Sequence, residues 1–140
     1  MRVLSLRIFA TTLGAMLLLT ASVASVASAA DADAAERQRQ SQELLGRLRT
    51  GLDAGRSGHP PASTATTAVP DLSRMRGLTR TQVASSLGQP THCDHHPYCA
   101  TSAAWVYDSF PSTITGGAAS RLLILFDADG HCASAQWVTP

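Results

Sequence analysis

Residues 121–138, RLLILFDADGHCASAQWV, decide the fold. The run 121–127 is apolar nearly throughout, and the run 133–138 ends in Trp137 and Val138. Between them, Asp127-Ala128-Asp129-Gly130 is a tight turn in which Gly130 supplies a positive φ. We therefore predict an antiparallel hairpin. Its first strand has two apolar faces, which are Leu122, Ile124 and Phe126 on one side and Leu123 and Leu125 on the other.

A third strand is predicted upstream, at residues 104–110 (AWVYDSF). Alternation places Trp105 and Tyr107 on one face and Val106 and Phe110 on the other. Large aromatic side chains are concentrated in the last third of the chain, so we expect the core there. We assign Trp105, Tyr107 and Trp137 to that core.

Two short helices are predicted before the strands, at residues 71–76 and 79–87. Asp71 can cap the first helix, and Thr79 with Gln82 forms a capping box at the start of the second. Each helix is followed by a glycine placed for a positive φ. These glycines are Gly77 and Gly88, and the inward-facing residues are Leu72, Met75, Val83 and Leu87. The order predicts an α+β fold over residues 70–140, with two short helices packed on a three-stranded antiparallel meander (ααβββ).

Four runs in this region share a pattern with one known family. They are RGLTRTQV at 76–83, LGQPT at 87–91, WVY at 105–107 and LLILFDADG at 122–130. In the same order, they resemble the GMTxxQVxxxLGxP signature, the WxY strand and the LxVxFDxxG hairpin of the BamE/SmpA/OmlA family. The resemblance implies a fold shared with β-lactamase-inhibitor-like domains. It also implies non-catalytic protein binding in the bacterial envelope, with outer-membrane β-barrel assembly components as partners.

The family-like spacing of strand 121–127 assigns Leu122, Ile124 and Phe126 to the core. The other apolar set then lies on the sheet face that normally meets solvent and is polar. We predict that this set forms an apolar patch that binds a protein partner. Its residues are Leu123, Leu125, Val106 and Val138.

The loop 92–99 (HCDHHPYC) holds the most concentrated chemistry of the sequence. We favour a Cys93–Cys99 disulfide, which closes seven residues and is worth about 2.4 kcal/mol in the chain-entropy model. A pairing through Cys132 is one alternative. The other is a Zn or Cu site, since thiolate and imidazole suit both metals. Its ligands would be His92, Cys93, His95, His96 and Cys99. No further cofactor is predicted.

The segment 1–29 has the three zones of a secretory signal peptide. Arg2 and Arg7 make a positive start, an uncharged run follows, and Ala27-Ser28-Ala29 is a cleavage motif. Polar residues inside the uncharged run make a membrane-spanning anchor the poorer alternative. The first cysteine is Cys93, so we expect no lipid anchor. We predict an exported, periplasmic protein that begins at Ala30 and meets the outer membrane only peripherally.

Two segments separate the signal peptide from the domain. Residues 30–54 are predicted to form a polar helix with a narrow leucine stripe. The stripe is Leu44, Leu45, Leu48 and Leu52. It could dock on a partner or on the domain, where it could cover the Leu123 and Leu125 face, but we favour a partly formed, solvated helix because its surroundings are polar. Residues 55–69 (GRSGHPPASTATTAV) are predicted to be a disordered linker.

Charge and motifs exclude several classes of function. The 140 residues include 11 basic ones, all arginine, and 10 acidic ones. Without Arg2 and Arg7, 9 arginines stand against 10 acids, which is not the basic footprint of a nucleic-acid binder. The sequence has no GxSxG elbow and no paired carboxylates, and the acidic turn at 127–130 lacks the other ligands of a calcium loop. We therefore predict that it is not an enzyme.

Three functional hypotheses follow. The first is an exported protein-interaction module that assists assembly of outer-membrane or envelope proteins. The second is a metal-binding periplasmic protein that uses the loop 92–99. The third is a secreted enzyme inhibitor, which only the inhibitor-like fold suggests.

Overall fold

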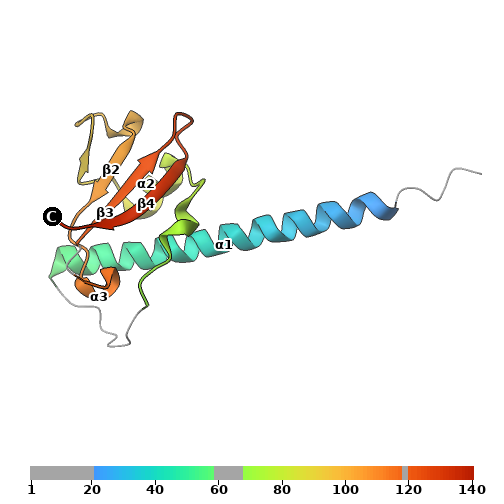
Figure 1. Cartoon of the computed structure of the whole chain (residues 1–140), viewed down its shortest axis with the longest axis horizontal. Coiled ribbons are helices and arrows are strands. Elements are labelled where there is room, and N and C mark those ends of the chain that lie inside the picture. Colours follow the sequence, from blue (N-terminus) through green and yellow to red (C-terminus); the bar gives the residue numbers. More distant parts are fainter. Residues whose placement is uncertain (1–20, 59–67, 118–119) are drawn as a thin grey trace, which may run out of the picture. The chain divides into compact units, whose positions relative to one another are not determined.

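The computed structural model describes residues 21–58, 68–117 and 120–140 (Figure 1). The chain divides into two compact units, Met1–Ala34 and Ala35–Pro140. The long helix α1, Ala21–Ser57, begins in the first unit and continues into the second. The fold described below is that of Ala35–Pro140.

The predicted signal peptide, residues 1–29, lies mostly outside the described residues. Its last part belongs to α1, which is helical through Ala27-Ser28-Ala29. No helix in the described ranges is long and apolar enough to cross a membrane. Cleavage after Ala29 stays a prediction.

Ala35–Pro140 is an α+β unit with a four-stranded antiparallel sheet in the order β1-β2-β3-β4. The strands are β1 His92–Cys93, β2 Ala104–Tyr107, β3 Arg121–Phe126 and β4 Cys132–Val138. Besides α1, the helical elements are η1 Leu72–Met75, α2 Arg80–Leu87, η2 Cys99–Thr101 and α3 Ser112–Thr115. The prediction of an α+β fold with antiparallel strands is confirmed.

Two details of that prediction need correction. The sheet has four strands instead of three, because His92 and Cys93 pair with Val106 and Trp105 and add a short edge strand. The first predicted helix, η1, is a single 3₁₀ turn capped by Asp71. The second, α2, has the expected capping box between Thr79 and Gln82.

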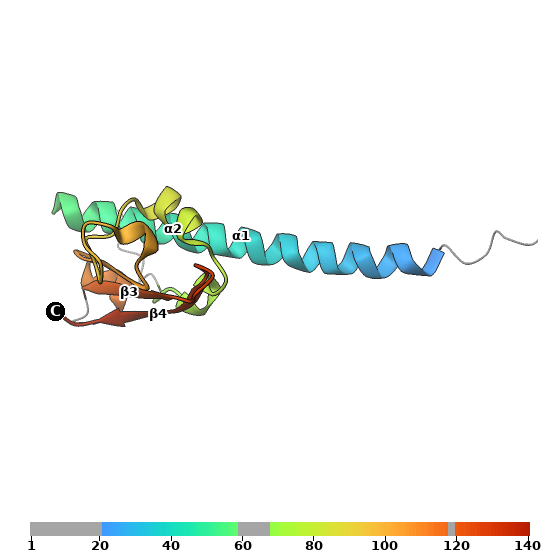
Figure 2. The same cartoon turned by 90° about the horizontal axis from the view of Figure 1, so that it is seen from above.

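The unit has a helical layer and a sheet layer. Figure 2 shows α1 and α2 on one side and β3 and β4 on the other. The core between the layers combines leucines of α1, residues of η1 and α2, and the inner face of the sheet. Its buried residues are Leu44, Leu45, Leu48, Leu52, Met75, Leu78, Val83, Leu87, Trp105, Tyr107, Phe110, Leu122, Ile124, Phe126 and Cys132. Trp137 is half-buried and packs against this core.

The expectation of a partly formed, solvated polar helix is wrong. The stripe of Leu44, Leu45, Leu48 and Leu52 is at most 4% exposed, and it belongs to the core together with Leu122 and Ile124. The helix also extends to Ser57, three residues into the predicted linker 55–69, of which residues 59–67 lie outside the described ranges. The stripe is narrow because only one face of α1 packs on the core, while η1 and α2 supply the other helical residues.

Two glycines let α1 approach the chain that follows β2. A Cβ atom on Gly55 would collide with the backbone carbonyl of Ser109, and one on Gly51 would collide with Ile114. Ser109 has a φ of +73°, which turns the chain back toward the core. Phe110 therefore lies in the core, where its ring packs edge-on against Trp137 with the ring centroids 5.0 Å apart. The prediction that Phe110 shares a face with Val106 is wrong.

Candidate interaction surface

The outer face of the sheet is the side turned away from α1 and α2 (Figure 2). Along β3, burial alternates. Leu122, Ile124 and Phe126 face the core and are at most 6% exposed, as predicted. Leu123 is half-buried and Leu125 is 38% exposed. Strand alternation thus places both leucines on the outer face.

The strand register shows which neighbours these leucines have. On β2, Val106 lies opposite Leu123, and Ala104 lies opposite Leu125. On β4, the partners of the two leucines are polar, Gln136 and Ser134. The apolar part of the outer face is therefore a strip two strands wide, made of Ala104, Val106, Leu123 and Leu125.

Val138 lies on the same face but does not pair directly with any residue of this strip. It is half-buried and lies opposite Arg121, one row beyond Leu123 and Gln136. Of the four predicted patch residues, the structure thus brings three together and leaves Val138 at a diagonal position.

The hypothesis that α1 folds back over Leu123 and Leu125 is also wrong. The leucine stripe of α1 packs with Leu122, Ile124 and Phe126, which face the opposite side of the sheet. In the described part of the chain, both α1 and α2 lie on that inner side (Figure 2). Within the described ranges, neither helix covers the apolar strip, and Leu125 is its most exposed residue.

An ion-pair cluster of His92, Asp108 and Arg121 lies at one end of the strip. The carboxylate of Asp108 lies 2.9 Å from Nε2 of His92 and 2.9 Å from Nε of Arg121. These residues come from β1, the end of β2 and the start of β3. Because Asp108 neutralises Arg121, this end carries little net charge.

Carboxylates surround the other end. Asp94 follows β1 and reaches the first residues of β2, while Asp127 and Asp129 belong to the turn after β3. Their nearest imidazoles are His95, 3.3 Å from Asp94, and His131, 3.9 Å from Asp127. The outer face thus has an apolar middle and an acidic end, a polarity that the alternation of apolar residues alone does not indicate.

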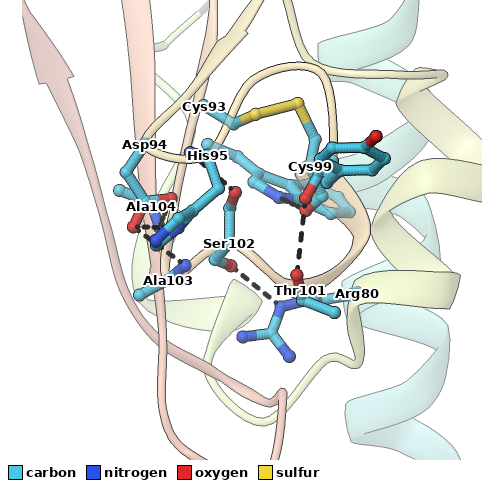
Figure 3. The surroundings of a disulfide bond; sticks show 11 residues. Arg80, Cys93, Asp94, His95, Cys99, Thr101, Ser102, Ala103 and Ala104 are labelled. Atoms are coloured by element: carbon cyan, nitrogen blue, oxygen red, sulfur yellow. Dashed lines mark hydrogen bonds and ion pairs between the residues drawn. A yellow bond between two sulfur atoms is a disulfide. The ribbon is translucent and has the colours of Figure 1, made fainter.

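The loop after β1 is fixed by covalent and polar contacts (Figure 3). Cys93 and Cys99 form a disulfide, with Cα atoms 5.5 Å apart. The indole N–H of Trp105 donates to the carbonyl of Cys99 at 2.6 Å. The backbone N–H groups of Ala103 and Ala104 donate to the carboxylate of Asp94. These contacts hold both ends of the loop against β2.

The electrostatics of Asp94 follow from the same contacts. Removal from water raises the pKa of a carboxyl group. Hydrogen bonds from the Ser102 side chain and from the N–H groups of Ala104 and Ala103 act the other way and outweigh it, so the pKa of Asp94 is lowered. Asp94 is therefore ionised at neutral pH and contributes to the acidic end.

The structure does not assemble the alternative metal site. The two sulfurs of the proposed set are bonded to each other, His92 is turned to Asp108, and His95 to Asp94. His96 is exposed. Within the described ranges, no three histidine, cysteine or carboxylate side chains are grouped to hold a metal ion.

Cys132 takes no part in the disulfide. It is a buried free thiol opposite Phe126 at the start of β4. Burial raises its pKa to about 11, so at neutral pH it is a protonated, unreactive thiol.

Replacing Cys93 and Cys99 together with serine is expected to lower the free energy of unfolding by about 2 kcal/mol, because the unfolded chain regains the entropy of the open loop. Urea unfolding of both proteins measures the difference. Peptide mapping of exported protein under non-reducing conditions serves as the check. A crosslink to Cys132, or free thiols at 93 and 99, would contradict this pairing.

Comparison with protein-family models, curated proteins and solved structures finds no match for this chain. The apolar strip was predictable from the two-sided pattern of β3. The acidic end was not, because Asp94 and Asp127 are distant in the sequence and come to one end of the sheet only through the strand pairing.

Proposed function

We propose that this chain is an exported, non-catalytic protein-interaction module that assists protein assembly in the cell envelope. The observation that carries the proposal is the open apolar strip of Ala104, Val106, Leu123 and Leu125. An outer sheet face is normally polar. A hydrophobic strip bordered by polar residues is typical of a surface that binds another protein.

Two further features support the envelope as the place of action. The disulfide of the loop after β1 is of a kind that forms and persists in oxidising compartments outside the cytosol. The segment 1–29 has the zones of a signal peptide. The resemblance of residues 70–140 to the BamE/SmpA/OmlA family supports outer-membrane β-barrel assembly components as partners.

The proposal is tested by purifying the full chain from the envelope of its native cells. We expect β-barrel assembly proteins to co-purify with the wild-type chain and to be lost in the double variant Leu123→Asp/Leu125→Asp. Gln42→Asp, on the exposed side of α1, is the matched control and should retain them. Equal recovery with the double variant would show that the outer face does not bind these partners.

Export is tested by the intact mass of the same material. We expect a chain that begins at Ala30 and carries no acyl group, because a small-residue cleavage motif ends at Ala29 and no cysteine follows it closely. A mass that matches the full precursor, or the chain plus lipid, would contradict the predicted processing.

A further inference from the structure

We propose that the outer face binds a single amphipathic helix whose basic residues lie against the acidic end formed by Asp94, Asp127 and Asp129. This inference rests on the proposed function, since it specifies the partner of the same surface. It is carried by the width of the apolar strip and by the distribution of charge around it.

The width of the strip fits one helix. Its apolar residues occupy two adjacent strands, β2 and β3, and its borders are polar on both sides. The borders are His92 beyond Val106, and Gln136 and Ser134 beyond the two leucines. Two strands at a spacing of about 4.8 Å, with their side chains, span about 10 Å. An α-helix has a diameter of about 10–12 Å, whereas a second sheet would need apolar residues across all the strands.

The apolar strip covers two rows of residues, Leu123 with Val106 and Leu125 with Ala104, which lie about 7 Å apart along the strands. The length of the whole of β3, from the Asp108–Arg121 pair to the acidic end, sets the length of the helix. The six residues of β3 extend over about 20 Å. At a rise of about 1.5 Å per residue, a helix of roughly 13 residues covers that distance. Leucines at every third or fourth position would form the apolar stripe that meets Leu123 and Leu125.

Charge determines which helix fits. Asp94, Asp127 and Asp129 lie in the loop and the turn at the Leu125 end of the strip, and they outnumber Arg80, which lies over the ring of Phe126 and donates from Nε to the carbonyl of Ser102. At the opposite end, Asp108 neutralises Arg121. A partner with basic side chains at one end would therefore be attracted in one orientation, and an acidic partner would be repelled. Cations are favoured in the last turn of a helix, so we place the partner's C-terminal turn at the acidic end.

Synthetic peptides of about 14 residues, the length that covers β3, are the probes. The basic peptide has leucines at helical spacing and three arginines in its last turns. The acidic peptide has glutamates in place of those arginines, and a third peptide has the basic composition with its leucines spread around the helix. Binding to the full chain is followed by fluorescence anisotropy and by amide chemical shifts of the protein.

We expect the basic peptide to bind and to shift the amide signals of Val106, Leu123 and Leu125. Leu125→Asp should weaken binding at least about tenfold, because it places a charge in the apolar contact. Asp129→Arg should weaken it roughly threefold to tenfold through lost attraction at the rim. Glu43→Arg makes the same charge change, from −1 to +1, at an exposed position of α1 and should leave binding unchanged.

Equal or tighter binding of the acidic or the leucine-scattered peptide would overturn the proposal, as would the absence of binding by any peptide. The co-purification experiment separates these failures from that of the proposed function. If β-barrel assembly proteins are lost in Leu123→Asp/Leu125→Asp while the peptides do not bind, the outer face is an interaction surface but its partner is not a basic helix.

Discussion

Leu48→Ala is expected to lower the free energy of unfolding by about 3–4 kcal/mol. Leu48 is 0% exposed and lies in the core together with Leu122 and Ile124. Truncation of a fully buried leucine removes its transfer free energy and leaves a cavity, and such changes cost about 2–5 kcal/mol. Urea unfolding of the full chain, followed by the fluorescence of Trp105 and Trp137, measures the loss.

Gln42→Ala is the matched control, because Gln42 lies on the exposed side of the same helix. It should change stability by less than about 0.5 kcal/mol. Equal small effects of the two changes would mean that α1 is solvated, as the polarity of its sequence suggests, and that the leucine stripe does not belong to the core.

Gly55→Ala is expected to cost about 3 kcal/mol. In an exposed helix, this change would add stability, since alanine is the better helix former. Here a Cβ atom would collide with the backbone carbonyl of Ser109, which cannot rotate away as a side chain could. The chain after β2 would have to move off α1, and overpacking of this kind costs about 1–3 kcal/mol or more.

Gly46→Ala, in the same helix, is expected to raise the free energy of unfolding instead of lowering it. A Cβ atom at Gly46 meets nothing within 4 Å, so this variant should gain about 0.5–1 kcal/mol. Thermal unfolding of the two variants compares them directly. If both are stabilised, the close approach of α1 to Ser109 is wrong.

Local signals in the sequence predicted much of the fold. The capping box of Thr79 and Gln82 marks the start of α2, and Gly77 and Gly88 have the positive φ expected after a helix. The alternation of β3 correctly separates Leu122, Ile124 and Phe126 from Leu123 and Leu125. Each of these features is determined by residues that lie within a few positions of one another in the sequence. A local sequence pattern can therefore predict them.

The features that the sequence did not predict depend on distant segments. The stripe Leu44 to Leu52 shows that α1 has an apolar face, but not that this face packs against the sheet beside α2. Gly55 begins a run of small and polar residues and therefore resembles the start of a linker. Its close contact with Ser109 cannot be predicted locally, because the two residues are far apart in the sequence. The position of Phe110 depends on the positive φ of Ser109, which its residue type does not favour.

The acidic end of the outer face was missed for a similar reason. In the sequence, Asp127 and Asp129 have the pattern of turn residues, and Asp94 belongs to a loop with cysteines and histidines. Asp127 follows Leu125 by two residues, but Asp94 reaches that end only because it accepts from the N–H of Ala104, which lies opposite Leu125.

The stability of Leu123→Asp/Leu125→Asp tests most directly whether the outer face is a free surface. Both side chains point away from the core, so the double variant should stay folded and lose no more than about 2 kcal/mol, about 1 kcal/mol for each aspartate in a strand. Leu122→Asp/Ile124→Asp, which buries two charges on the inner face of the same strand, should not fold. Urea unfolding of the two proteins decides the matter. If Leu123→Asp/Leu125→Asp unfolds as well, both leucines belong to a core and the proposed interaction surface does not exist.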